Sequence, residues 1–424
     1  MKIVISGYSI EDILIFLALM TPGFANCNDS LPLDLSEIII LILFSITVLK
    51  SIKLKYITIP KSLIMLFFYI IIITFILNKN GYESLKTIGI WVIYTYTIYT
   101  YVYKKMNLDI VIKLLYNLSF IVALIGIIQE IGFEIKMEGM YNFSWIGINN
   151  AITSTGGLLR VTSVFTEPAH LSIIMIPAIC LFIINYFNNY KMNFNNKFKN
   201  IIILICSFFT FSMIVYLSIT IVVIYFVFTE GNNSGKKIIM IFLSILILFF
   251  IISKYNESLQ LISYKIQSFF TLDELDNNNL SSFAVISNLR IAIEKIKDGY
   301  ILGTGMDSHA TTYFNYIDSI YAGNSIVMYL NYQDASSIYI RILSEFGIVG
   351  ILIYIRFIIK MQFINIKKGL KSTNIYVANR ICLICMVCYG IRIGAYVNAY
   401  YILMIVMVIV SNARVKSYGG EKND

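Results

Sequence analysis

Charged residues are scarce in this chain. Only 13% of its 424 residues are Asp, Glu, Lys or Arg, whereas 58% are hydrophobic and the mean hydropathy is +0.77. Apolar stretches near bilayer-spanning length recur from end to end. Because these stretches are long and show little strict alternation, the sequence excludes a soluble domain, disfavours a β-barrel and predicts an all-α polytopic membrane protein.

Cysteine and histidine are also few, with six and two residues. Five cysteines lie in apolar runs and only Cys27 falls in an expected loop, so no disulfide framework is predicted. Cys382, Cys385 and Cys388 have a metal-like spacing, but no histidine lies near them, and we expect them to pack between helices. We therefore predict no metal site and no cofactor.

Positive charge exceeds negative charge, with a formal net charge of +9. Its distribution follows the inside-positive bias of membrane insertion, so we expect no nucleic-acid partner. The first apolar run follows Glu11 and Asp12, not the positive charges of a signal peptide, and we interpret it as the first span.

The apolar runs predict about twelve membrane-spanning helices within a single integral domain, 1–424. The runs lie near 10–25, 36–49, 62–78, 87–103, 111–132, 166–187, 200–213, 214–229, 237–253, 336–359, 375–391 and 394–411. Lysines on both sides of Asn200–Phe228 favour a tight hairpin there, with both chain termini cytoplasmic. Segments 133–165 and 254–334 then become external loops that are long enough to carry function.

The larger loop contains the stretch SSFAVISNLRIAIEKIKDGY, whose apolar residues have helical spacing. It predicts an amphipathic helix that ends near Gly299 and rests on the bundle. The following GTGMDSH, Gly303–His309, predicts a flexible turn. It lacks the third glycine and the preceding strand of a dinucleotide-binding fingerprint.

The smaller loop leads into RVTSVFTEPAHLSIIMIPAI, Arg160–Ile179. Pro168 suits the first turn of a helix, which places Glu167 and His170 one turn apart on one face. They could act on one substrate. Alternatively, Glu167 complements the helix dipole and His170 sits at a polar boundary. Pro177 predicts a kink in the same helix.

Several arginines are expected near the external loops, at the outer end of the helix that begins at Pro168. Arginine clusters bind phosphates bidentately. Arg160, Arg290 and Arg392 together indicate an anionic, lipid-borne substrate, although each could instead be structural or snorkelling. Arg341 and Glu345, at i and i+4 near the tenth span, could pair with each other or contact substrate.

Two blocks carry a resemblance to a known family: R…S.F.EP.H at Arg160–His170, and S…E.G..G leading into the tenth span. With the expected spans and loops, the chain resembles the O-antigen polymerase family, within a superfamily shared with O-antigen ligases. The resemblance implies a GT-C-like fold that polymerises undecaprenyl-diphosphate-linked oligosaccharides at the outer face of the cytoplasmic membrane. It implies no nucleotide sugar and allows a chain-length regulator as partner.

The ligases carry a histidine, then Asn, Ser or Gln, then nine residues and a Gly-x-x-Gly element. Gly347 and Gly350 match that element, but Ser336 stands at the histidine position, which favours a polymerase over a ligase. The polymerase pattern of an arginine followed after ten residues by glycine is also absent, because Leu171 and Ile301 stand at those glycine positions. The family's phosphate-binding role is therefore assigned to Arg160 and Arg290 only because of where they lie in the chain, and not because they match the family's arginine motif.

The predicted mechanism uses an arginine clamp and a general base. Arg160 and Arg290 hold the donor diphosphate, and Glu167 or His170 removes the acceptor proton, with Asp334, Asp307 and His309 in reserve. Arg341, Arg392 and His309 are further expected substrate contacts. A flippase or transporter is the non-enzymatic alternative, but it would concentrate binding groups near the membrane midplane.

Overall fold

The structure is a computed structural model, and the residues it describes are 4–5, 8–21, 35–53, 61–78, 81–105, 108–148, 150–155, 157–188, 196–229, 280–320, 329–362 and 374–420. Within these ranges the chain is predominantly helical, as predicted. The described strands form two antiparallel hairpins of two-residue strands, β1 (Val4–Ile5) with β2 (Tyr8–Ser9) and β3 (Ser154–Thr155) with β4 (Leu158–Leu159).

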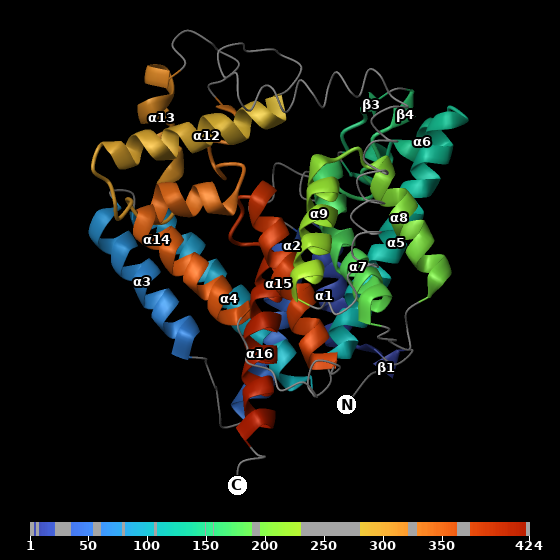
Figure 1. The fold of residues 1–424 in the computed structure, drawn as a ribbon, viewed down its shortest axis with the longest axis horizontal. Helices are drawn as coiled ribbons and strands as arrows, with labels where there is room; N and C mark the ends of the chain where they lie inside the picture. Colours follow the sequence, from blue (N-terminus) through green and yellow to red (C-terminus); the bar gives the residue numbers. More distant parts are fainter. Residues whose placement is uncertain are drawn as a thin grey trace.

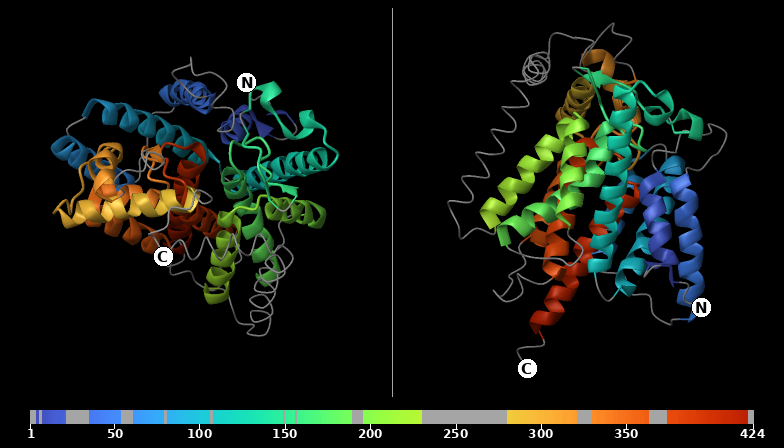
Figure 2. Two further views of the ribbon diagram at one scale, coloured as in Figure 1. Left: turned by 90° about the horizontal axis from the view of Figure 1, so that it is seen from above. Right: turned by 90° about the vertical axis from the view of Figure 1, so that its right-hand side faces the viewer.

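A bundle of long helices forms the body of the molecule (Figure 1). Its helices are α1 (Ile10–Met20), α2 (Leu35–Lys53), α3 (Lys61–Leu77), α4 (Gly81–Lys104), α5 (Asp109–Glu134), α7 (Pro168–Asn188), α8 (Lys197–Phe209), α9 (Met213–Thr229), α14 (Ile338–Gln362), α15 (Asn374–Arg392) and α16 (Ala399–Gly420). At one end lie α6 (Glu138–Tyr141), η2 (Ser144–Ile146), α12 (Leu280–Lys297), α13 (His309–Ile320), β3 and β4. We call this the α12 end; both termini lie at the opposite end, and Figure 2 shows the bundle from two further sides.

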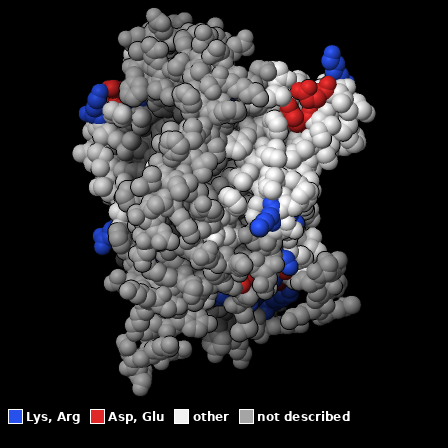
Figure 3. Space-filling model, turned by 45° about the vertical axis from the view of Figure 1, so that its right-hand side comes forward, with Lys and Arg blue, Asp and Glu red and all other residues white. Residues whose placement is uncertain are grey.

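Among the described helices, four are long and apolar enough to cross a membrane: α5, residues Pro168–Asn185 of α7, α14, and residues Ile375–Arg392 of α15. Shorter apolar stretches lie in α3, α9 and α16. Charged side chains are few on the described part of the face in Figure 3, which leaves broad uncharged surface for lipid. The predicted span 237–253 lies outside the described residues, so the number of about twelve spans stays a prediction.

Two local predictions about the smaller helices are confirmed. α8 ends at Phe209 and α9 begins at Met213, with Phe211 at φ 44° in the turn, which is the expected tight hairpin. The predicted amphipathic helix is α12, and Gly299 follows it at φ 92°. Pro168 begins α7 as expected, and α7 continues through Pro177 to Asn188.

The centre of the bundle is apolar, with α7, α15 and α16 among its most buried helices. Cys180, Cys382, Cys385 and Cys388 are all buried there, because α7 and α15 pack against each other. The expected packing role of the cysteines on α15 is therefore confirmed.

The expected single span 336–359 is divided by a kink. Gly347 lies inside α14 at φ 64° and ψ −163°, where the helical path breaks. At this break the Ile348 amide donates to the carbonyl of Ile301 at 2.9 Å. The amides of Thr304 and Gly305 both donate to the carbonyl of Glu345, at 2.9 and 2.8 Å. The predicted turn at Gly303–His309 is present, and α14 supplies hydrogen-bond partners for its backbone, which the sequence did not predict.

Candidate functional site

Several of the predicted site residues meet at the α12 end. Glu167 is exposed immediately before α7, and His170 lies in the first turn, with Nδ1 3.2 Å from the Thr166 hydroxyl oxygen. Glu167, Asp334 and Arg392 are all close enough to interact electrostatically with His170. Arg160 interacts in the same way with Glu167. We call Arg160, Glu167, His170, Asp334 and Arg392 the mouth cluster.

Gln129 on α5 holds the loop that carries Arg160. Its Oε1 accepts from the amides of Thr162 and Ser163, at 3.1 and 2.8 Å, and its Nε2 donates to the Thr162 hydroxyl at 3.2 Å. The Arg160 amide donates to the carbonyl of Thr153 at 2.8 Å, next to the β3–β4 hairpin. A buried glutamine with saturated partners fixes the loop backbone and hence the position of Arg160.

Arg160 is half-buried, and its Nε makes no hydrogen bond with any described residue. Burial lowers the pKa of its guanidinium, and the nearby Glu167 carboxylate opposes that shift. The group remains cationic at neutral pH because an arginine is not deprotonated in proteins. Arg160 is therefore a cation beside the exposed Glu167, with one buried donor that no described residue satisfies.

The turns that carry Asp334 and Arg392 pack on each other. Ile338 donates its amide to the carbonyl of Ile393 at 2.9 Å, and the Ser337 hydroxyl donates to the carbonyl of Gly390 at 2.8 Å. A Cβ at Gly394 would overlap the carbonyl oxygen of Asp334, so only glycine permits this approach. The start of α14 and the end of α15 thus form one platform.

A second group of charges lies buried beside this platform, and we call Arg341, Glu345, Asp307 and Tyr396 the buried charge network. Arg341 donates from Nε to Glu345 at 2.9 Å, from Nη2 to Asp307 at 2.7 Å and from Nη1 to the Gly394 carbonyl at 3.2 Å. The Tyr396 hydroxyl donates to Glu345 at 2.7 Å, and its ring centroid is 4.3 Å from the Arg341 guanidinium.

The expected pair of Arg341 and Glu345 therefore exists, and every nitrogen of Arg341 has a protein acceptor. Arg341 is 8% exposed and Glu345 is fully buried. This geometry corresponds to the structural alternative, in which the paired arginine fixes its surroundings. A contact of Arg341 with substrate stays a prediction.

His309, an expected substrate contact, is also fully buried. Its Nδ1 lies 2.9 Å from the Ser344 hydroxyl and its Nε2 lies 2.7 Å from Oδ1 of Asn288. Burial, with a smaller contribution from the cations Arg341 and Lys295, lowers the pKa of His309 to about 3. A neutral histidine with both nitrogens occupied joins α12, α13 and α14.

Lys295 is a buried cation that the sequence patterns did not reveal. Its Nζ donates to the hydroxyls of Thr304 and Thr312, at 2.6 and 2.7 Å, and to the carbonyl of Ser344 at 2.8 Å. Burial lowers its pKa to about 8. Lys295 thus anchors α12 to the loop that carries Asp307.

Arg290 lies on the same helix and is half-buried, and α12 packs against α13 and α14. The role of Arg290 as a phosphate ligand stays a prediction.

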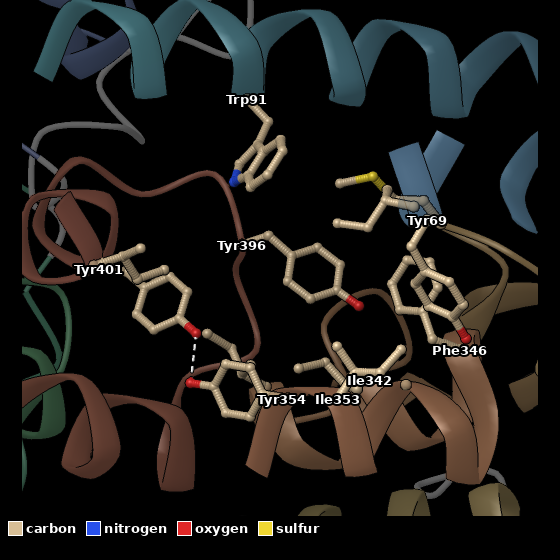
Figure 4. A pocket seen from close by; sticks show the side chains of 13 residues that line it. Tyr69, Trp91, Ile342, Phe346, Ile353, Tyr354, Tyr396 and Tyr401 are labelled. Atoms are coloured by element: carbon tan, nitrogen blue, oxygen red, sulfur yellow. Dashed lines mark hydrogen bonds between the residues drawn. The ribbon is translucent and has the colours of Figure 1, made fainter. Parts of the chain in front are cut away.

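An apolar cavity of about 80 Å³ adjoins the buried charge network (Figure 4). Its walls include Tyr69, Trp91, Phe346 and Tyr354, and the ring of Tyr396 separates it from Glu345. The Tyr354 and Tyr401 hydroxyl oxygens lie 2.7 Å apart and satisfy each other. The lining suits hydrocarbon and not sugar.

A protein-family model matches part of the chain. Residues 198–355 match the family model described as O-antigen ligase. The matched segment runs from α8 into α14, and it includes Asp334, Arg341 and Glu345 but not Arg160 or Glu167. No curated protein matches the chain. Over this segment the chain is therefore similar to the O-antigen ligase/polymerase superfamily, a family of membrane enzymes that act on lipid-linked glycans.

Proposed function

We propose that this protein is a glycosyltransferase that polymerises undecaprenyl-diphosphate-linked repeat units at the outer face of the cytoplasmic membrane. The observation that carries the proposal is the mouth cluster. It combines arginines and potential bases at one end of a helical membrane bundle in this superfamily. A diphosphate-linked donor needs a cationic clamp, and a sugar hydroxyl acceptor needs a base.

In the proposed reaction, Arg160 and Arg392 bind the diphosphate, and Arg290 is a further candidate ligand. The bond between the donor's anomeric carbon and the phosphate oxygen breaks, and the arginines stabilise the negative charge left on the carrier diphosphate. The acceptor hydroxyl oxygen forms the new glycosidic bond, and its proton passes to the exposed Glu167 carboxylate. His170 and Asp334, which interact electrostatically with each other, are further candidates to orient the acceptor or to replace Glu167 as the base.

The buried charge network has a positioning role in this scheme. Arg341 binds the Gly394 carbonyl, and Gly394 contacts Asp334, so the network holds the platform that presents Asp334 and Arg392. We propose that the neighbouring apolar cavity faces the lipid part of the substrate. We also retain a GT-C-like arrangement of about twelve spans, metal independence and a chain-length regulator as partner within this proposal.

A ligase is the second candidate, because the matching family model is described as O-antigen ligase. Ser336 argues against it. This residue stands where the ligases have histidine, is fully buried and has a hydroxyl that bonds to no described residue. A buried serine cannot accept a proton from an acceptor sugar as an exposed histidine could.

The test is an electrophoretic ladder of surface polysaccharide from cells that lack the protein. We expect the deletion to leave carrier-derived products with a single repeat unit and the wild-type chain to restore the ladder. Glu167→Gln and Arg160→Ala should abolish long chains, because loss of a base or of charge stabilisation typically costs about 10²–10⁴ in rate. Glu138→Gln, an exposed glutamate on α6, is the matched control and should restore the ladder.

Membrane levels of each variant must equal those of wild type for the comparison to hold. Full ladders from both Glu167→Gln and Arg160→Ala would refute the assignment of the mouth cluster. Loss of even the single-unit product in the deletion strain would support ligation in place of polymerisation.

A further inference from the structure

A second and larger cavity lies at the end opposite the mouth cluster. It measures about 410 Å³ and lies between α1, α5 and α8. Its apolar walls are Ile13, Phe16, Leu114, Phe120 and Ile121, and its polar groups are Tyr8, Asp12, Asn117 and Lys199. All three helices begin at this end, so their amino-terminal dipoles add partial positive charge to it.

Two carboxylates beside this cavity, Asp12 and Glu11, are already paired with lysines. Asp12 accepts from Lys105 at 2.7 Å and from the Tyr101 hydroxyl at 2.6 Å, and Glu11 accepts from Lys50 at 2.6 Å. Lys113 and Lys199 make no ion pair with a carboxylate among the described residues. Lys199 is therefore a cation at the rim of the cavity without a carboxylate partner among the described residues, beside apolar walls.

The polar groups at the rim keep donors in reserve. Lys199 Nζ donates to Oδ1 of Asn117 at 3.1 Å, which uses one of its three hydrogens. Nδ2 of Asn117 donates to the Tyr8 hydroxyl oxygen at 3.0 Å, so the Tyr8 hydrogen remains available. Lys199 is half-buried and lies 4.8 Å from the centroid of the Phe120 ring, directed across the cavity wall. A lysine that only snorkelled to water would extend away from these groups.

We propose that this cavity binds a membrane lipid with an anionic phosphate headgroup. Lys199 and the Tyr8 hydroxyl donate to the phosphate, and one acyl chain lies among Phe16, Leu114 and Ile121. Charge complementarity selects the headgroup, since a phosphate supplies the missing counterion of Lys199. The apolar volume selects a lipid over free phosphate. This site does not depend on the proposed polymerase activity.

The test is native mass spectrometry of the full-length protein, purified in detergent and titrated with phosphatidylglycerol or phosphatidylcholine. Wild type should retain one phosphatidylglycerol in preference to phosphatidylcholine. Lys199→Gln should weaken phosphatidylglycerol binding about five-fold, which corresponds to the contribution of about 1 kcal/mol expected for one lysine. Lys197→Gln removes an equal charge from an exposed position on the same turn of α8 and should bind as wild type. Ile121→Trp fills the cavity without changing its charge and should also lose the lipid.

Four results would overturn the proposal. Equal weakening by Lys197→Gln would show diffuse surface attraction, and equal binding of phosphatidylcholine would remove the headgroup selectivity. Full competition by inorganic phosphate would show that the apolar cavity contributes nothing. A photoreactive residue at position 16 tests the proposal without changing Lys199 or filling the cavity. It should cross-link to lipid. A cross-link to another segment of the same chain would show that the protein fills its own cavity.

Discussion

At the scale of single residues, the burial of Glu345 determines how much it contributes to the stability of the fold. Glu345 is fully buried and accepts from both Arg341 and Tyr396. Its removal leaves Arg341 with Asp307 as its remaining carboxylate partner, in a position only 8% exposed. Removal of one partner from a buried ion pair strongly lowers the free energy of unfolding, because a buried charge is left unpaired. An exposed ion pair contributes little to that free energy.

We therefore expect Glu345→Leu to lower the free energy of unfolding by about 3 kcal/mol or more. Lys297→Ala is the matched control, because it breaks the exposed pair of Lys297 with Glu294 and should change stability by less than about 1 kcal/mol. Thermal unfolding of both purified variants in the same detergent measures the difference. Equal melting temperatures would show that the network contributes no more than a surface pair.

The sequence revealed one part of the polar site and missed another. Glu167 and His170 could be found because they adjoin Pro168 at the start of an apolar run, and both lie in the mouth cluster. Tyr396 and Lys295 could not, because their partners lie far along the chain: Glu345 is 51 residues from Tyr396, and Ser344 is 49 from Lys295. Neither periodicity nor charge spacing encodes such contacts.

At the scale of elements, the kink in α14 joins a helix to a loop. Gly347 has φ 64°, and a Cβ at this position would overlap the carbonyl oxygen of Ile301. Gly303, at φ 77°, packs equally closely against the backbone of Glu345. The amphipathic pattern sufficed to predict α12, since an apolar face is local information. The kink was not predictable in the same way, because it depends on a loop more than forty residues earlier in the chain.

We expect Gly347→Ala to disrupt this junction, because alanine both disfavours the positive φ and collides with the loop backbone. The amount of folded variant in the membrane should fall sharply, and the protein that does fold should unfold at a lower temperature than wild type. Gly139→Ala on α6 is the control, since a Cβ there meets no atom within 4 Å. If the two variants accumulate and unfold alike, the close approach of α14 and residues 301–305 is wrong.

At the scale of the whole molecule, long-range contacts order the two ends of the bundle. Asn78, just after α3, and Ser84, in the first turn of α4, both donate to the carbonyl of Met306, each at 2.7 Å, so the end of α3 and the start of α4 lie at the α12 end. Arg414 on α16 donates to the carbonyls of Tyr103 and Lys105, at 3.0 and 2.7 Å, so α4 and α16 finish together at the other end. The hydrophobic runs predicted where the helices lie in the sequence. Which helix ends lie together in space could be learned only from these long-range contacts.

The inside-positive bias predicts that the α12 end faces outward and that the end carrying both termini faces the cytoplasm. We therefore expect Lys297→Cys, at the exposed end of α12, to react in intact cells with a maleimide that cannot cross the membrane. Lys104→Cys, exposed at the end of α4, should react only after the cells are permeabilised. The five described native cysteines are buried, and Cys27 is replaced by serine in both variants and in a background control. Labelling of Lys104→Cys but not Lys297→Cys in intact cells would invert the orientation, and the mouth cluster could then not act on a substrate at the outer face.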